Sequence, residues 1–241
     1  MGEALGRRGR LLLGETSGGS PIWLSARDHQ HRHLYFFREY EPDVTALFQR
    51  LVRPGSTVYD VGANAGYFTL LAHELGASVH AFEPHPIVTR LLERSVALQR
   101  ERRGRITVVP AACSERSELM RLFLGPVHST GMSSVEKPGL QWADVPGITL
   151  DDYSRRVGHK PDLVKIDVEG HELEVLRGAI ELLREARPVV IVETEKAEVL
   201  DLMSGLDYEP RRVLASGSLT EHDGSLELAA RGYENVCFLP A

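Results

Sequence analysis

One stretch, Thr57–Ala72, constrains the fold more than any other part of the chain. Its sequence, TVYDVGANAGYFTLLA, begins with the β-branched and aromatic residues that are typical of a buried strand. Small residues follow from Gly62 to Gly66, and apolar residues at helical spacing begin at Tyr67. A strand, a glycine turn and a helix in this order let the backbone approach a ligand closely, and the helix N-terminus offers unpaired N–H groups. The stretch therefore predicts a ligand-binding turn.

The rest of the chain predicts an α/β domain with a Rossmann-like, doubly wound and mostly parallel sheet. Strand and helix patterns alternate along the first half of the chain, as they do in one half of such a sheet. With 241 residues, the chain has the size of one large domain. The further predicted strands are Ser78–Pro84, Ile106–Ser114, Asp162–Asp167, Pro188–Glu193 and Glu234–Pro240, and a long helix is expected over Glu169–Glu185.

Two parts of the chain depart from this alternation. Residues 1–40 join a glycine-rich, basic beginning to a stretch with aromatics and histidines, and we expect an N-terminal extension or lid before a domain at 41–241. Further on, Glu118–Leu124 and Val145–Leu150 have the pattern of strands on either side of an irregular block. We interpret them as an inserted hairpin with loops that replaces a crossover helix and covers the carboxyl edge of the sheet.

Three histidines alternate at His29, His31 and His33. Alternation would place them on one face of a strand, or the three could be scattered in a loop. A zinc site would need a fourth ligand and a closed geometry, for which the sequence shows no signature. We therefore interpret this segment as a polar lid or cap and assign no metal ligand to it.

Composition and charge exclude several kinds of partner. The net charge is −6 and the isoelectric point is near 5.9, which argues against nucleic acid because phosphate contacts need a basic face. No apolar run is long enough for a membrane span, and Leu11–Leu13 is too short for the core of a signal peptide. Cys113 and Cys237 stand in apolar, strand-like segments and are expected to be buried, unpaired residues. We expect a soluble cytoplasmic protein, either a monomer or a homo-oligomer.

A glycine turn of this kind serves both dinucleotide dehydrogenases and S-adenosylmethionine enzymes. The turn lacks the G-x-G-x-x-G triplet that seats a pyrophosphate, and it has no Arg or Lys to clamp one. Asp60, two residues before Gly62, can instead interact with a positively charged group of the ligand, such as a sulfonium or an amino group. Glu83 stands at the end of the next predicted strand and can accept from a ribose diol, which suits either cofactor. S-adenosylmethionine is favoured; NAD, or a turn that binds nothing, is the weaker alternative.

Several segments together resemble the FkbM family of S-adenosylmethionine-dependent methyltransferases, within the class I methyltransferase superfamily. They are TVYDVGANAGYFTLLA, AFEPHP, VVPAACS, TLDDY, DLVKIDVEGHELEVLRGA and PVVIVE, of which KIDVEGHE is the most specific. The resemblance implies a seven-stranded sheet whose last strand is antiparallel, and transfer of a methyl group, usually to a hydroxyl oxygen. The acceptors of this family are varied, so the identity of the acceptor does not follow.

The resemblance also assigns roles to residues of this chain. The residues implied to surround the methionine part of the cofactor are Asp60, Gly62, Asn64, Gly66 and Tyr67. Glu83 would hold the ribose, and Pro84 and Ala112 would flank the adenine. Asp167 would also contact the cofactor, in the methyl-transfer region.

Three residues are candidates for a general base, because an aliphatic hydroxyl is a poor nucleophile until its proton is removed. Asp167 ends a predicted strand at the carboxyl edge, where ligands bind in open α/β sheets. His171 titrates in the useful pH range, although it could also be an exposed residue at a helix start. Glu169 could be catalytic or could only favour the positive end of that helix. Asp167 and Glu193 could share a divalent ion with a substrate oxygen, but their spacing does not require one.

The sequence therefore predicts an S-adenosylmethionine-dependent O-methyltransferase that acts on a hydroxyl of a small or medium metabolite, of the secondary-metabolite or sugar type. The alternative is a non-catalytic, methyltransferase-like module that binds the cofactor in a regulatory or assembly role. The first 35 or so residues and the Gly125–Gly147 block match the family least. We expect specificity for the acceptor to lie in these two segments.

Overall fold

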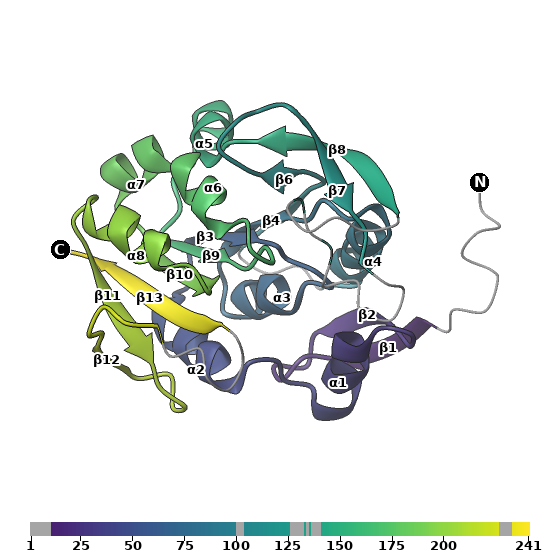
Figure 1. Cartoon of the computed structure of the whole chain (residues 1–241). Helices are drawn as coiled ribbons and strands as arrows, with labels where there is room; N and C mark the ends of the chain where they lie inside the picture. Colours follow the sequence, from purple (N-terminus) through teal and green to yellow (C-terminus); the bar gives the residue numbers. More distant parts are fainter. Residues whose placement is uncertain (1–10, 100–103, 126–132, 134, 136–140, 227–232) are drawn as a thin grey trace.

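The computed structural model of the chain describes residues 11–99, 104–125, 133, 135, 141–226 and 233–241 (Figure 1). Within these residues a central sheet of eight strands has the order β12-β11-β13-β10-β9-β3-β4-β5. The strands are β3 (Thr57–Val61), β4 (Ser78–Phe82), β5 (Ile106–Val109), β9 (Leu163–Ile166), β10 (Val189–Thr194), β11 (Tyr208–Val213), β12 (Leu219–Glu221) and β13 (Glu234–Pro240).

The pairing of the strands confirms the predicted Rossmann-like sheet. Neighbouring strands are parallel along the run β5, β4, β3, β9 and β10. Strand β13 is antiparallel to both β10 and β11. The predicted count of seven strands is one too low, because β12 pairs antiparallel with β11 and extends the edge of the sheet. The antiparallel last strand is as predicted.

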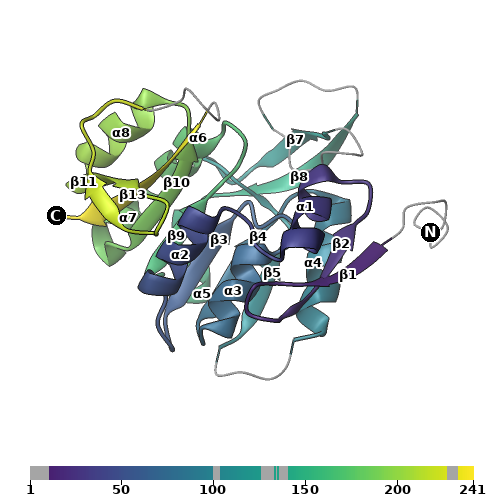
Figure 2. The ribbon, with the colours of Figure 1, turned by 90° about the horizontal axis from the view of Figure 1, so that it is seen from below.

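Helices cover both faces of this sheet (Figures 1 and 2). Along β3, Val58 packs into the core on one face, whereas Tyr59 and Val61 pack into the core on the other. This alternation is the period of two that a sheet buried on both sides requires. One face is covered by α2 (Pro42–Leu51), α3 (Tyr67–Glu74) and α4 (Pro86–Ala97), and the other by α5 (Leu150–Val157), α6 (Glu172–Arg177), α7 (Ile180–Ala186) and α8 (Ala197–Ser204).

The helix predicted over Glu169–Glu185 is wrong in two respects. It begins at Glu172 rather than at Glu169, and it is divided into α6 and α7 around Gly178. A Cβ atom at Gly178 would lie 2.0 Å from the carbonyl oxygen of Ser114, so the backbone passes there too closely for any side chain. The two helices are therefore divided at a point where the chain has room only for glycine.

The strand predicted over Ile106–Ser114 is also divided. The chain leaves the central sheet after β5, and β6 (Ala112–Cys113) joins a second sheet of three described strands with β8 (Trp142–Ile148) and β7 (Leu119–Phe123). Antiparallel pairing of β7 with β8 confirms the inserted hairpin. This hairpin does not replace the crossover helix, because α5 still packs on the sheet before β9. The loop between β7 and β8 lies largely outside the described residues.

The N-terminal segment forms a hairpin and a helix. The hairpin is β1 (Leu11–Glu15) with β2 (Pro21–Ser25), and it lies against α4, where the Ser95 hydroxyl accepts from the Trp23 N–H at 2.8 Å. The histidines lie on α1 (His29–Phe37), so the prediction of a strand or loop for them is wrong. Asp28 caps this helix by accepting from the His31 N–H.

No helix in the described part of the chain combines the length and the apolar character that a membrane crossing needs. Cys113 and Cys237 are buried and unpaired, as predicted.

Candidate functional site

A cavity of about 200 Å³ opens at the carboxyl ends of the parallel strands. Its walls come from the segments after β3, β4, β5 and β9, from β10 and from α1. The residues predicted from the sequence that line it are Asp60, Gly62, Asn64, Tyr67, Glu83, Pro84, Ala112, Asp167, Glu169 and His171. Gly66 is outside this lining and stands at the start of α3 instead.

The glycine turn after β3 packs directly on the end of β9. Gly62 has a φ of +84°, and a Cβ atom there would lie 1.8 Å from the carbonyl oxygen of Asp167. The Asp167 N–H in turn donates to the Val61 carbonyl at 3.0 Å. The missing side chain at Gly62 therefore lets the turn and Asp167 meet at one point of the cavity.

Glu83 holds the turn from the neighbouring strand. Its two carboxylate oxygens accept from the backbone N–H groups of Asn64, at 2.9 Å, and His85, at 2.7 Å. Burial raises the pKa of Glu83 to about 7, although the two N–H donors act against this rise. Each carboxylate oxygen can accept a second hydrogen bond, so a ribose diol can still bind to Glu83.

The part of the wall that α1 forms includes two residues that the sequence did not single out as site residues. On α1, His31 Nε2 lies 3.1 Å from Asn64 Oδ1, and Gln30 Oε1 accepts from Asn64 Nδ2 at 3.3 Å. Burial lowers the pKa of His31, although Asp28 and the hydrogen bond with Asn64 act in the other direction. The alternating histidines were the available signal in the sequence. Because we interpreted them as part of a strand or loop, the contact of His31 with the glycine turn was not predicted.

Asp60 and Tyr67 form hydrogen bonds with other side chains of the chain. The buried Asp60 carboxylate accepts from the Thr69 hydroxyl, and burial raises its pKa while Lys165 lowers it. The Tyr67 hydroxyl lies 3.2 Å from Thr45 Oγ1. Both residues line the cavity from the side of β3 and α3.

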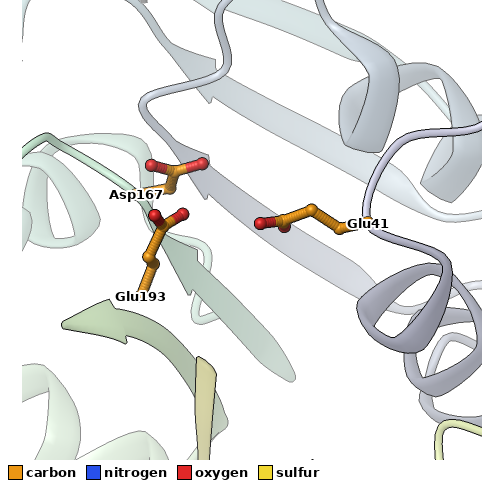
Figure 3. A group of neighbouring side chains, drawn as sticks. All are labelled: Glu41, Asp167 and Glu193. Carbon is orange, nitrogen blue, oxygen red and sulfur yellow. The ribbon is translucent and has the colours of Figure 1, made fainter. Parts of the chain in front are cut away.

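An acidic cluster of Glu41, Asp167 and Glu193 lies beside the turn (Figure 3). Glu41 precedes α2, Asp167 follows β9 and Glu193 belongs to β10, and one carboxylate oxygen from each lies within 4.8 Å of the other two. Burial raises the pKa of Glu41 and of Glu193, and the neighbouring carboxylates raise both further. The sequence did not assign Glu41 to the site.

The buried Lys165 compensates part of this negative charge. Its Nζ donates to Asp167 Oδ2 at 3.0 Å and lies 4.6 Å from the centre of the Phe68 ring. Burial lowers the pKa of the Lys165 ammonium, but the surrounding carboxylates, Asp167 first among them, outweigh it and raise that pKa. The raised pKa favours the charged form of Lys165 beside the cluster.

His171 and Glu169 lie on the same loop but in different surroundings. His171 Nε2 is 3.0 Å from the Ser114 hydroxyl, and its Nδ1 is 3.6 Å from a Glu174 oxygen. These contacts tie His171 to Ser114, which follows the Ala112–Cys113 part of the cavity wall. Glu169 has a φ of +55° and lines the cavity before α6 begins.

The fold and the site define a class I methyltransferase domain, in which a glycine turn after the first parallel strand faces an acid after the second. Residues 60–210 match the family model described as the methyltransferase FkbM domain, and the chain belongs to this family. S-adenosylmethionine is the cofactor of the family, as the sequence predicted.

Curated relatives and a solved structure resemble the chain. It is 33% identical over 156 residues to the hexuronic acid methyltransferase AglP of Haloferax volcanii, covering 63% of this chain and 61% of that relative. It is 30% identical over 161 residues to the 31-O-demethyl-FK506 methyltransferase FkbM of Streptomyces tacrolimicus, covering 53% and 60%. The chain thus spans about three fifths of their length. A methyltransferase FkbM structure from Methylobacillus flagellatus has the same fold, with a TM-score of 0.51, 17% identity, and coverage of 86% of this chain and 52% of that one.

Proposed function

We propose that the protein is an S-adenosylmethionine-dependent O-methyltransferase that methylates a hydroxyl group of a small or medium metabolite. The observation that carries this proposal is the meeting of Gly62 and Asp167 at one point of the cavity that Glu83 also lines. The names of the two curated relatives, which methylate a hexuronic acid and a demethylated FK506, support a small-molecule acceptor.

The residues of the cavity fit the cofactor. Glu83 offers two carboxylate oxygens to a ribose diol, Gly62 leaves room for close backbone approach, and Ala112 with Pro84 forms an apolar wall for a flat ring. S-adenosylmethionine, when bound, supplies an electrophilic methyl group on a sulfonium.

The acidic cluster is proposed to take up the acceptor proton, with Asp167 as the base. With the cofactor held between the glycine turn and Glu83, its methyl group would pass to the acceptor oxygen, and S-adenosylhomocysteine would be the other product. The hydroxyl proton passes to the Asp167 carboxylate and then to water. Lys165, whose Nζ donates to Asp167 Oδ2 at 3.0 Å, keeps that carboxylate in place before the transfer.

The N-terminal extension, residues 1–40, is proposed to act as a lid. Its described part supports this role, because Gln30 and His31 reach the glycine turn through Asn64. Exclusion of water by such a segment would favour alignment of the acceptor oxygen with the methyl group.

Calorimetry with S-adenosylmethionine and S-adenosylhomocysteine, followed by turnover on a panel of hydroxylated metabolites, tests the function. We expect both nucleosides to bind and at least one acceptor to yield S-adenosylhomocysteine and a methyl ether. Binding without turnover on any acceptor would favour the alternative of a non-catalytic module. Failure of both nucleosides to bind would overturn both functions.

A further inference from the structure

We propose that Glu41, Asp167 and Glu193 form a binding site for one divalent cation of the Mg²⁺, Mn²⁺ or Ca²⁺ class, which holds the oxygen of the methyl acceptor. The role toward the acceptor rests on the proposed function, whereas binding of the ion does not.

The geometry of the three carboxylates suits a single ion. They come from three different elements and point toward one another across a common space (Figure 3). A cation with metal–oxygen distances of about 2.4 Å places two opposite ligand oxygens about 4.8 Å apart. One carboxylate oxygen of each residue lies within 4.8 Å of the other two, so the three are close enough for side-chain rotation to bring them to the same ion.

Glu41 supplies an independent observation. Its side chain is buried, with 8% of the residue exposed, and its Oε2 atom has no hydrogen-bond partner among the described residues. Its other oxygen accepts from Asn235 Nδ2 at 3.4 Å. A buried carboxylate oxygen beside other carboxylates is costly unless a cation or a donor meets it. An ion at the centre of the cluster would be that partner.

The negative charge of the cluster favours a divalent cation over a monovalent one. Lys165 is the neighbouring cation, and its Nζ is already hydrogen-bonded to Asp167. With all three carboxylates ionised around a bound cation, and with the ammonium of Lys165 beside them, the cluster would carry a formal charge of −2. Ligands that are all oxygen favour hard cations such as Mg²⁺, Mn²⁺ and Ca²⁺ over Zn²⁺ or Cu²⁺, which favour nitrogen and sulfur.

An ion at this place would be useful for the proposed reaction. Asp167 and Glu193 line the cavity, so an open coordination position on their side would accept the acceptor oxygen. A divalent ion lowers the pKa of a bound hydroxyl and orients it. A carboxylate oxygen that does not bind the ion can still receive the proton.

Binding of Mn²⁺ to the full chain, after chelator treatment and dialysis, tests the site. Free Mn²⁺ is followed by electron paramagnetic resonance in the parent, in Glu41→Gln and Glu193→Gln, and in Glu185→Gln, a control on an exposed carboxylate of α7. We expect about one ion per chain, an affinity at least about tenfold weaker in the first two variants, and an unchanged affinity in the control. Absence of Mn²⁺ binding by the parent up to millimolar concentration, or equal affinity in all four proteins, would overturn the site.

Circular dichroism and S-adenosylhomocysteine calorimetry on the same proteins separate this inference from the proposed function. If Glu41→Gln does not fold, Glu193→Gln and the parent still decide the outcome. Turnover that is insensitive to chelator, in a chain that binds no Mn²⁺, would overturn the ion site and leave the methyltransferase proposal intact. The parent could instead bind one Mn²⁺ per chain, with binding lost in both Gln variants, and bind neither nucleoside. This result would support the ion site and overturn the proposed methyltransferase function.

Discussion

The backbone N–H of Asn64 donates to Glu83 Oε2 at 2.9 Å, which joins the glycine turn after β3 to the acid after β4. The other Glu83 oxygen accepts from the His85 N–H, at the start of α4. One carboxylate therefore fixes two loops of the cavity and also faces it. Its removal would change both the shape of the cofactor site and a contact that we propose to the ribose.

Glu83→Ala is expected to weaken binding of S-adenosylhomocysteine by about 1.5–3 kcal/mol, because hydrogen bonds to a charged group are lost. This corresponds to roughly a 10–150-fold rise in Kd, which calorimetry would measure. Glu83→Gln is the matched control, since its amide oxygen still accepts one hydrogen bond, and we expect a smaller loss. Equal affinity of Glu83→Ala and the parent would refute the assignment to the ribose.

Asp167→Asn is expected to leave the affinity for S-adenosylhomocysteine within a few fold and to lower turnover by about 10²–10⁴, the usual contribution of a general base. The backbone contact with Val61 is kept, so the turn should hold its shape. Single-turnover rates measure the chemical step directly. Asp201→Asn, on the exposed side of α8, is the control and should turn over like the parent. A parental rate in Asp167→Asn would exclude it as the base.

Lys165→Met tests how the buried charges stabilise the fold. The substitution leaves Asp167 and its acidic neighbours without their ammonium, and breaking a buried ion pair costs about 3–5 kcal/mol of unfolding free energy. Urea unfolding measures this loss. Lys160→Met is the matched control, because Lys160 pairs with Glu185 at 2.9 Å on the surface, and a surface pair is worth about 1 kcal/mol or less. Equal losses in the two variants would contradict a stabilising role for Lys165.

The local parts of the site could be predicted from the sequence because each depends on neighbouring residues. The strand, glycine turn and helix of Thr57–Ala72 appear as β3, the turn and α3, and Glu83 and Asp167 follow their strands as expected. A residue that directly follows a parallel strand lies at the carboxyl edge whatever the rest of the fold does.

The distant contacts could not be predicted in this way. Glu41 meets Asp167 and Glu193 only because α2 packs beside the sheet. The sequence around Glu41 contains no pattern that predicts a contact with these two residues. The close approach of Gly178 to Ser114, at the division between α6 and α7, is likewise a contact between distant segments that the apolar pattern of one long helix does not show. In both places tertiary packing decides what the local sequence leaves open.

The raised pKa of Glu83 predicts a pH dependence of stability. Burial raises this pKa from 4.5 to about 7, so between these values the folded chain holds a proton that the unfolded chain has lost. The free energy of unfolding should therefore fall as pH rises through this window, by up to about 3 kcal/mol from this group. Urea unfolding of the parent and of Glu83→Gln at about pH 5 and about pH 8 would measure it, since the variant lacks the titration and should lose less stability. Because an ionised Glu83 is the better acceptor for ribose hydroxyls, S-adenosylhomocysteine should bind the parent more tightly above the pKa. Stability curves that run parallel in the two proteins would show that Glu83 ionises in the folded chain as it does in the unfolded one.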